Sequence, residues 1–196
     1  MEKLRLFVAI PMPETVRNEI IRFQHELQGL VPSDAIRWTK PEQFHLTLRF
    51  LGDVPAERVA ALQEAIHAVC RDSPALCLRV QGIGFFRSAQ SPRVIWIGVS
   101  DDEGRLVDLQ KRIETTIQSF SPEKGTEKFA GHVTIGRVKI LKRPEIGNLA
   151  AHAEAVKDRL FGEWTANKVE LIRSELSPNG ANHTVLAAFH LAACKK

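Results

Sequence analysis

This 196-residue chain contains no tyrosine and few sulfur-containing residues, with 3 cysteines and 2 methionines. The cysteines are Cys70, Cys77 and Cys194, an odd number without a paired C-x-x-C spacing. Such a set predicts neither a disulfide framework nor a zinc site. We therefore expect free thiols in a reducing cytoplasm.

Long hydrophobic runs are also missing. No stretch approaches the roughly 20 apolar residues needed to span a membrane. The apolar segment 4–10 is too short for a signal peptide, and Pro11 ends it. We expect a cytoplasmic monomer that is not attached to a membrane.

The net charge of the chain does not exclude any class of binding partner. The formal net charge is +4, which favours an anionic partner such as RNA without requiring one. Hydrophobic residues make up 44% and charged residues 26%, a composition typical of a folded protein and not of a disordered one. The length suits one domain, or two closely packed lobes.

A five-residue pattern occurs twice, first at 44–48 (FHLTL) and again at 131–135 (GHVTI). In an extended strand alternate side chains share a face, so His45 and Thr47 point to one side while aliphatic residues point to the other. His132 and Thr134 repeat this arrangement. Two histidine–hydroxyl pairs on two strands could therefore face one substrate.

The surrounding segments also recur at a nearly constant offset. The first strands begin at 4 and 93, the histidines lie at 45 and 132, and later strands begin at 76 and 161. This pattern predicts one bilobal domain over 1–196, with repeat units at about 4–86 and 93–176 and one further strand near 182–193. The lobes would be related by an approximate twofold axis, with the active site in the groove between them.

Strands alternate with helices and no Rossmann glycine pattern is present, which favours an α+β fold with mainly antiparallel sheets and flanking helices. Apolar residues at helical spacing predict four helices. We expect a short link at 35–41, a break in the strand 44–51 at Gly52-Asp53, a bulge or bend near Gly82, and a helix cap at Asp101 or Asp102. The stripe of the last helix includes Val156 and Leu160, and 161–176 is expected to be one strand.

The residue types in the repeated pattern suit phosphodiester chemistry. Two histidines titrating near pH 7 can act as an acid and a base, and each threonine can donate a hydrogen bond to a phosphate oxygen. Arg137 could add a positive charge. Strict alternation places Arg137 on the opposite face from His132, so it reaches the site only if the strand bends or ends around Gly136.

The paired H-x-T motifs resemble the two-histidine (2H) phosphoesterase superfamily, and in particular the RNA 2′,3′-cyclic phosphodiesterases, historically called 2′-5′ RNA ligases. The resemblance extends over almost the whole chain. It includes the stretches 7–10, 37–52 (RWTKPEQFHLTLRFLG), 92–98 (PRVIWIG), 129–137 (FAGHVTIGR) and 174–180 (SELSPNG).

This resemblance implies hydrolysis of a terminal 2′,3′-cyclic phosphate to a 2′-phosphate, without a metal or other cofactor. It implies that His45 is the general acid that protonates O3′ and that His132 is the general base that activates water. Thr47, Thr134 and Arg137 would hold the phosphate. The family tends to have proline where this chain has Gly131, and often tyrosine where it has His183.

Other functions remain open at this point. The site could act on RNA ends, on cyclic nucleotides or on a small cyclic phosphate such as ADP-ribose cyclic phosphate, and it could catalyse weak 2′-5′ ligation in reverse. A non-catalytic nucleotide- or RNA-binding module is a further alternative. A metal site is disfavoured, because no acidic residue or cysteine shares the spacing of the two motifs.

Overall fold

The computed structural model of this chain describes residues 2–121, 128–177 and 180–193. Nine strands, four α-helices and three short 3-10 helices follow one another in these segments. Their order is β1 (Lys3–Pro11), α1 (Glu14–Gln28), β2 (Ile36–Trp38), η1 (Pro41–Gln43), β3 (His45–Pro55), η2 (Ala56–Arg58), α2 (Val59–Arg71), β4 (Leu76–Phe86), β5 (Val94–Ser100), α3 (Arg105–Ile117), η3 (Gln118–Phe120), β6 (His132–Val138), α4 (Arg143–Ala155), β7 (Leu160–Ala166), β8 (Lys168–Ser177) and β9 (Gly180–His190).

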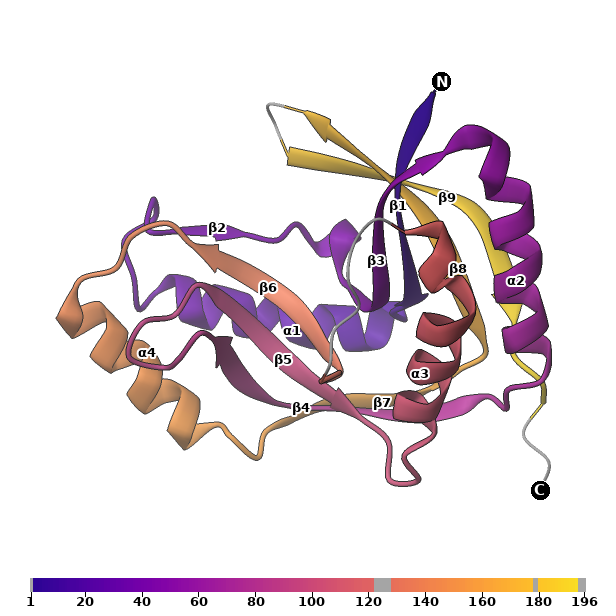
Figure 1. Cartoon of the computed structure of the whole chain (residues 1–196). Coiled ribbons are helices and arrows are strands. Elements are labelled where there is room, and N and C mark those ends of the chain that lie inside the picture. Colours follow the sequence, from indigo (N-terminus) through magenta and orange to yellow (C-terminus); the bar gives the residue numbers. More distant parts are fainter. Residues whose placement is uncertain (1, 122–127, 178–179, 194–196) are drawn as a thin grey trace.

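The strands form two antiparallel sheets, which confirms the predicted α+β fold class (Figure 1). Sheet A has the order β3-β1-β8-β9, and sheet B has the order β2-β6-β5-β4-β7. The strands with the two histidine motifs each lie next to the first strand of their half of the chain, β3 next to β1 and β6 next to β5. On its other side, that first strand pairs with a strand from the other half of the chain: β1 with β8 in sheet A, and β5 with β4 in sheet B. Each sheet therefore needs both halves of the chain.

The helices cover the sheets in a matching way. Helices α2 and α3 pack against each other and against sheet A, whereas α1 and α4 contact β7 and β4 of sheet B (Figure 1). The apolar stripe predicted for α1 is buried at Val16, Ile20, Phe23 and Leu27. One large hydrophobic core joins side chains of both sheets and all four helices.

Strand β1 is buried on both faces. Leu6, Val8 and Ile10 belong to the large core, while Phe7 and Ala9 form a small second cluster with Ile172 of β8. Side chains alternate along a strand, so this second cluster lies on the opposite face of sheet A. That is the face to which His45 points, because Phe7 lies against its ring.

Two expectations about the first half of the chain are wrong. The link at 35–41 contains β2, which pairs with β6 at the edge of sheet B. A three-residue strand is too short to show an alternating pattern. Strand β3 does not end at Gly52-Asp53 but continues to Pro55. Gly52 adopts a φ of 65°, and the pairing with β1 shifts by one residue there, which lets the strand continue as a bulge.

The expectations for the end of the chain are also partly wrong. The predicted strand 161–176 is two strands, β7 in sheet B and β8 in sheet A, because the chain crosses between the sheets at Asn167. Helix α4 ends at Ala155, and Leu160 begins β7. The bulge near Gly82 is confirmed, since the pairing of β4 with β5 shifts there and Gly82 has a φ of 68°.

Local capping follows the sequence at α3. The Asp101 carboxylate accepts hydrogen bonds from the backbone N–H groups of Arg105 and Leu106, at 2.7 and 3.1 Å. The N–H groups of the first turn of a helix have no acceptor inside the helix, so an acceptor at the N-terminus stabilises the helix. The polar segment 121–128 of the sequence lies mostly outside the described residues. No helix among the described residues is both long enough and apolar enough to cross a membrane.

Candidate active site

The two histidine motifs lie on strands that contact each other across the junction of the sheets, β3 from sheet A and β6 from sheet B. His45 and Thr47 are half-buried, as are His132 and Thr134. The aliphatic residues between and after them are fully buried in the core. The two rings are near enough that a charge on His132 lowers the pKa of His45.

A β-bulge in β6 decides where Arg137 points. Thr134 pairs with Trp96 and Gly136 pairs with Ile95, so Ile135 is an extra residue without a partner of its own on β5. One extra residue reverses the alternation of side chains beyond it. Arg137 therefore lies on the same face as His132 and Thr134, which the rule of strict alternation had excluded.

The positive charge of Arg137 lies close to Arg37 and to His132. Arg137 lies directly opposite Arg37 of β2 in the sheet pairing. Partial burial and the charge of Arg37 lower the pKa of Arg137, and the charge of Arg137 in turn contributes to the lowered pKa of His132. A cluster of positive charge next to an imidazole is a setting that an anion would stabilise.

Strand β3 has the same bulge at the equivalent position. Thr47 pairs with Ala9 and Arg49 pairs with Val8, so Leu48 is the extra residue. Beyond this bulge Phe50 shares a face with His45, as Arg137 does with His132. Phe50 is 55% exposed, and its ring centroid lies 5.7 Å from that of Phe7.

His45 is enclosed by rings. The ring centroid of Phe7 is 4.8 Å away and that of His183, from β9, is 5.5 Å away. Burial, together with the charges of His183 and His132, lowers the pKa of His45 to about 4, against a hydrogen bond to the Gln43 backbone that raises it. Without a ligand, His45 is therefore neutral at pH 7.

The end of the β8–β9 hairpin is held close to this ring. The Gln43 side chain donates a hydrogen bond to the backbone carbonyl of Ala181, two residues before His183. His183 also meets the ring of Phe7, with centroids 5.0 Å apart. Burial lowers the pKa of His183 as well. The residue that stands at the family's tyrosine position is thus in contact with the first motif histidine.

His132 lies in a different setting. Its Nδ1 is 2.7 Å from the carbonyl oxygen of Ala130, and because a carbonyl only accepts, Nδ1 carries the proton and Nε2 has a free lone pair. The rings of His132 and Phe86 form a T-shaped pair with centroids 4.7 Å apart, and the centroid of Trp96 is 6.1 Å away. Burial lowers the pKa of His132 despite the hydrogen bond to Ala130.

Two glycines make this packing possible. A Cβ on Gly84 would overlap the indole of Trp96, so only glycine leaves room for that ring across β4. A Cβ on Gly131 would overlap the backbone carbonyl of Val99, and the carbonyl of Gly131 accepts a hydrogen bond from the Val99 N–H. This close approach to β5 accounts for glycine where the family tends to have proline.

Sequence reasoning missed the aromatic residues of the site. Phe7, Phe86 and Trp96 contact the two histidines, yet only tertiary contacts connect them to the motifs. One signal was available for Phe50, which follows His45 at the same interval at which Arg137 follows His132. Within the described residues, no three His, Cys, Asp or Glu side chains gather as a set of metal ligands would.

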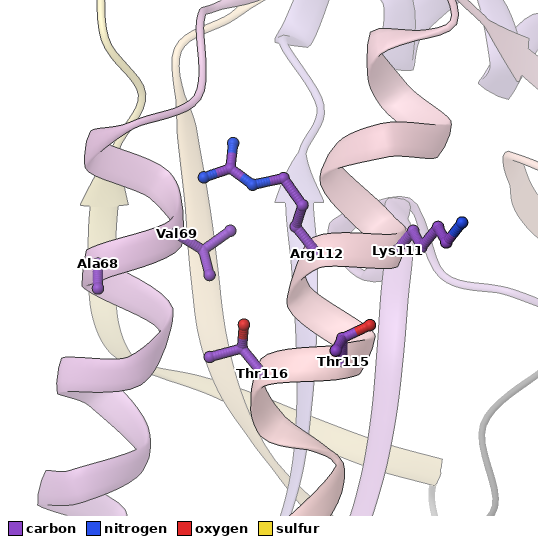
Figure 2. Close-up of a pocket in the computed structure, with 6 residues that line it drawn as sticks. All are labelled: Ala68, Val69, Lys111, Arg112, Thr115 and Thr116. Carbon is purple, nitrogen blue, oxygen red and sulfur yellow. The ribbon is translucent and has the colours of Figure 1, made fainter.

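A cavity of about 450 Å³ lies elsewhere, between α2 and α3 (Figure 2). Six residues line it: Ala68, Val69, Lys111, Arg112, Thr115 and Thr116. Arg112 is held in place by hydrogen bonds to the carbonyl of Asp72 and the hydroxyl of Ser73. None of the predicted site residues lines this cavity, so its size is no guide to the chemistry.

Comparison with known proteins supports the resemblance. A family model described as LigT-like phosphoesterase matches residues 10–96. A protein named RNA 2′,3′-cyclic phosphodiesterase from Methanocaldococcus jannaschii is 33% identical over 183 residues, covering 93% of this chain and 98% of its own. A protein of the same name from Thermotoga maritima is 35% identical, with 93% of each chain covered.

The fold is shared as well. The crystal structure of TT0787 from Thermus thermophilus is similar with a TM-score of 0.80 and 28% identity, covering 98% of this chain and all of its own. Escherichia coli LigT in complex with 3′-AMP gives a TM-score of 0.76 at 23% identity, with 97% and 99% covered. The resemblance expected from the two motifs is confirmed, and the chain belongs to the LigT-like phosphoesterase family, together with the proteins named RNA 2′,3′-cyclic phosphodiesterase.

Proposed function

We propose that this chain hydrolyses 2′,3′-cyclic phosphate ends of RNA or nucleotides to 2′-phosphates. One observation carries the proposal: two bulged strands each present a histidine and a threonine at the junction of the sheets, and the bulge in β6 adds Arg137 to the same face. This supplies two proton-transfer groups, two hydroxyl donors and a cation, which is what a phosphodiester displacement needs. The names of the relatives point to the same substrate class.

In the proposed reaction His132 accepts a proton from water through Nε2 as the water oxygen attacks phosphorus. The bond between phosphorus and O3′ breaks, and His45 donates a proton to O3′. The products are a 2′-phosphate and a free 3′-hydroxyl, so atoms and charge balance. Thr47, Thr134 and Arg137 donate hydrogen bonds to the non-bridging oxygens, on which negative charge increases in the transition state.

The protonation states support one role directly and place a condition on the other. The lowered pKa of His132 keeps it neutral at pH 7, as a base must be. A pKa of about 4 leaves His45 neutral too, and an acid needs a proton to give. An anionic phosphate bound next to the ring favours the imidazolium and raises its pKa. The acid role of His45 therefore depends on substrate binding.

Because these steps use only proton transfer and hydrogen bonding, we propose that no metal takes part. We also propose that the chain acts as a single bilobal domain, since both halves contribute strands to each sheet. A cytoplasmic location agrees with the free thiols of Cys70 and Cys77.

The test is an RNA oligonucleotide ending in 2′,3′-cyclic phosphate, incubated with the protein in excess EDTA. We expect conversion to an RNA ending in 2′-phosphate, identified by mass and by comparison with synthetic 2′- and 3′-phosphate standards. The variants H45A and H132A, prepared in parallel, exclude a contaminating nuclease. Absence of hydrolysis, or a requirement for added metal, would refute the proposal.

ADP-ribose cyclic phosphate belongs in the same experiment as a competing substrate. A higher kcat/KM for that compound than for any RNA end would move the proposed activity to small cyclic phosphates. Tight binding of cyclic-phosphate RNA without turnover would instead indicate a binding module.

A further inference from the structure

Two buried glutamines contact the two β-bulges of the candidate active site. Gln24 of α1 is 4% exposed, and Gln110 of α3 is 5% exposed. The Gln24 side chain donates a hydrogen bond to the carbonyl of Ile135, the extra residue of β6, at 2.9 Å. The Gln110 side chain donates one to the carbonyl of Leu48, the extra residue of β3, at 3.3 Å. The same kind of contact therefore occurs in both halves of the chain.

The two glutamines occupy equivalent positions in the repeat. Each lies on the helix that follows the first strand of its half, and the interval between them in sequence nearly equals the interval between Leu48 and Ile135. The buried face of a helix is normally apolar, and a buried amide is costly unless it is hydrogen-bonded. Two such amides on the extra residues of two bulges indicate a role in shaping those bulges.

The bulge of β6 is tied to α1 by both N–H groups of Gln24. A bulge leaves its extra residue without a partner in the strand ladder, and buried backbone groups are nearly always paired. The carbonyl of Ile135 accepts hydrogen bonds from the Gln24 side chain and from the backbone N–H of Thr39, the latter at 3.0 Å. Gln24 Nε2 also donates to the carbonyl of Thr39 at 2.9 Å. One side chain thus joins α1, the bulge of β6 and the segment after β2.

The residue after the bulge adds a second contact with a helix on β3 but not on β6. Arg49 of β3 is 6% exposed and forms an ion pair with Glu114 of α3, with Nε and Oε2 2.9 Å apart. The equivalent position on β6 is Gly136, since each residue follows the extra residue of its strand. Glycine has no side chain with which to reach a helix. The polar contact from α1 to the bulge of β6 therefore comes from Gln24.

We propose that Gln24 is a positioning residue that fixes the bulge of β6 and thereby keeps Arg137 on the same face as His132. Arg137 lies two residues beyond the extra residue, so its face depends on the bulge. Gln110 is the counterpart of Gln24 on β3, where the residue two positions beyond the bulge is the uncharged Phe50. The effect on hydrolysis rests on the proposed function, whereas the position of Arg137 can be measured without any reaction.

The test variant is Q24M, because methionine is unbranched and of similar size but cannot donate a hydrogen bond. It is studied alone and together with R137Q, which removes the charge that Gln24 is proposed to position. One control is Q110M, the equivalent change in the other half. A second control is S73A, which removes two hydrogen bonds of another buried side chain, to a carbonyl of α2 at 2.7 Å and from an arginine of α3 at 2.8 Å.

NMR titration of the imidazole C–H signals of His132 in the ligand-free protein reports where Arg137 lies. The charge of Arg137 contributes to the lowered pKa of His132, so moving the guanidinium to the other face should let that pKa rise. Gln24 is uncharged and has no such effect of its own. We expect an upward shift of the pKa in Q24M and in R137Q, and no further shift when the two changes are combined. Q110M and S73A should leave the pKa of His132 unchanged.

Hydrolysis of RNA ending in 2′,3′-cyclic phosphate gives the functional readout. Q24M should lower kcat/KM by about tenfold, and by no more than R137Q does, because it acts through Arg137. In the R137Q background the same change should lower kcat/KM by less than about twofold, since effects that share one contact are not additive. Any loss caused by Q110M or S73A should instead be the same in the R137Q background as in the wild type.

The two readouts separate failure of this proposal from failure of the proposed function. If the wild type does not hydrolyse the RNA, the proposed function is wrong, and the NMR titration still decides whether Gln24 positions Arg137. If Q24M leaves the pKa of His132 where S73A leaves it, or if its loss of kcat/KM multiplies with that of R137Q, the positioning role is wrong.

Urea unfolding confirms that each variant is folded. If Q24M does not fold, Q24N replaces it, because asparagine keeps an amide on a side chain that is one methylene shorter. Q24N should shift the pKa of His132 in the same direction, and an unchanged pKa in a folded Q24N protein would refute the positioning role.

Discussion

The two halves of the candidate site share a backbone and differ in their chemistry. On β3 and on β6 a histidine and a threonine alternate with buried aliphatic residues, and a one-residue bulge follows. Each histidine also has a hydrogen bond to the backbone two residues earlier, His45 to Gln43 and His132 to Ala130. The positions beyond the bulge differ: Phe50 on β3 and Arg137 on β6.

The two histidines therefore lie in different environments, although the backbone around them is similar. Aromatic rings lie against both histidines, but on the β3 side burial, together with the charges of His183 and His132, lowers the pKa of His45 to about 4. The β6 half opens onto the positive charge of Arg137 and Arg37. A duplicated pair of strands can thus hold two similar groups while burial and charge give them unequal proton affinities.

The largest effect is expected from removing either histidine. H45A and H132A should each lower kcat by about 10²–10⁴-fold, the usual contribution of a positioned acid or base. Hydrolysis of a 4-nitrophenyl phosphodiester, whose leaving group needs no proton, separates the two roles. H45A should lose little activity on this compound while H132A stays impaired. The opposite result would exchange the acid and the base.

The stability of the fold should reveal the burial of His45. Its pKa falls from 6.5 in the unfolded chain to about 4 in the folded one, so the folded state binds fewer protons between these values. The resulting stability is complete above pH 6.5 and is lost as the pH falls to 4, by up to about 3 kcal/mol at 1.36 kcal/mol per pKa unit.

Urea unfolding at pH 7.5 and pH 4 measures this loss. Acidic side chains contribute equally in the wild type and in H45Q, so the difference between the two proteins isolates His45. We expect the free energy of unfolding of H45Q to fall less on acidification. An identical fall in both proteins would show that His45 is not buried as described.

The residue that follows the bulge should affect catalysis on β6, where it is Arg137, but not on β3, where it is Phe50. Arg137→Gln should lower kcat/KM by roughly 10–100-fold, since a hydrogen bond to a charged group contributes about 1.5–3 kcal/mol. Phe50→Leu, the equivalent change on β3, should stay within about threefold because no charge is lost there. Steady-state kinetics on cyclic-phosphate RNA gives both values. Equal losses of kcat/KM in the two variants would contradict the different roles of Arg137 and Phe50.

The smallest change is expected from His183→Tyr, which restores the residue common in the family. Removing the charge of His183 should raise the pKa of His45, while burial, the larger cause, still keeps it below 6.5. Titration of the imidazole C–H signals by NMR in the ligand-free protein measures the shift. His190→Tyr, at an exposed position on the same strand, is the control and should leave His45 unchanged.

The sequence by itself determined which side chains share a face over short distances. His45 with Thr47, His132 with Thr134, and the buried stripe of α1 follow from the periods of strand and helix, which are properties of the local backbone. The family resemblance followed from the same residues, because the motif is contained in a few consecutive positions.

The tertiary structure decided what depends on a neighbouring strand. A bulge is defined by the partner that lacks the extra residue, so the placement of Arg137 could not be predicted from β6 alone. The division of 161–176 between two sheets, and the contact of His183 with His45, likewise depend on segments distant in sequence. Two strands that look alike in sequence therefore became unequal through what packs against them.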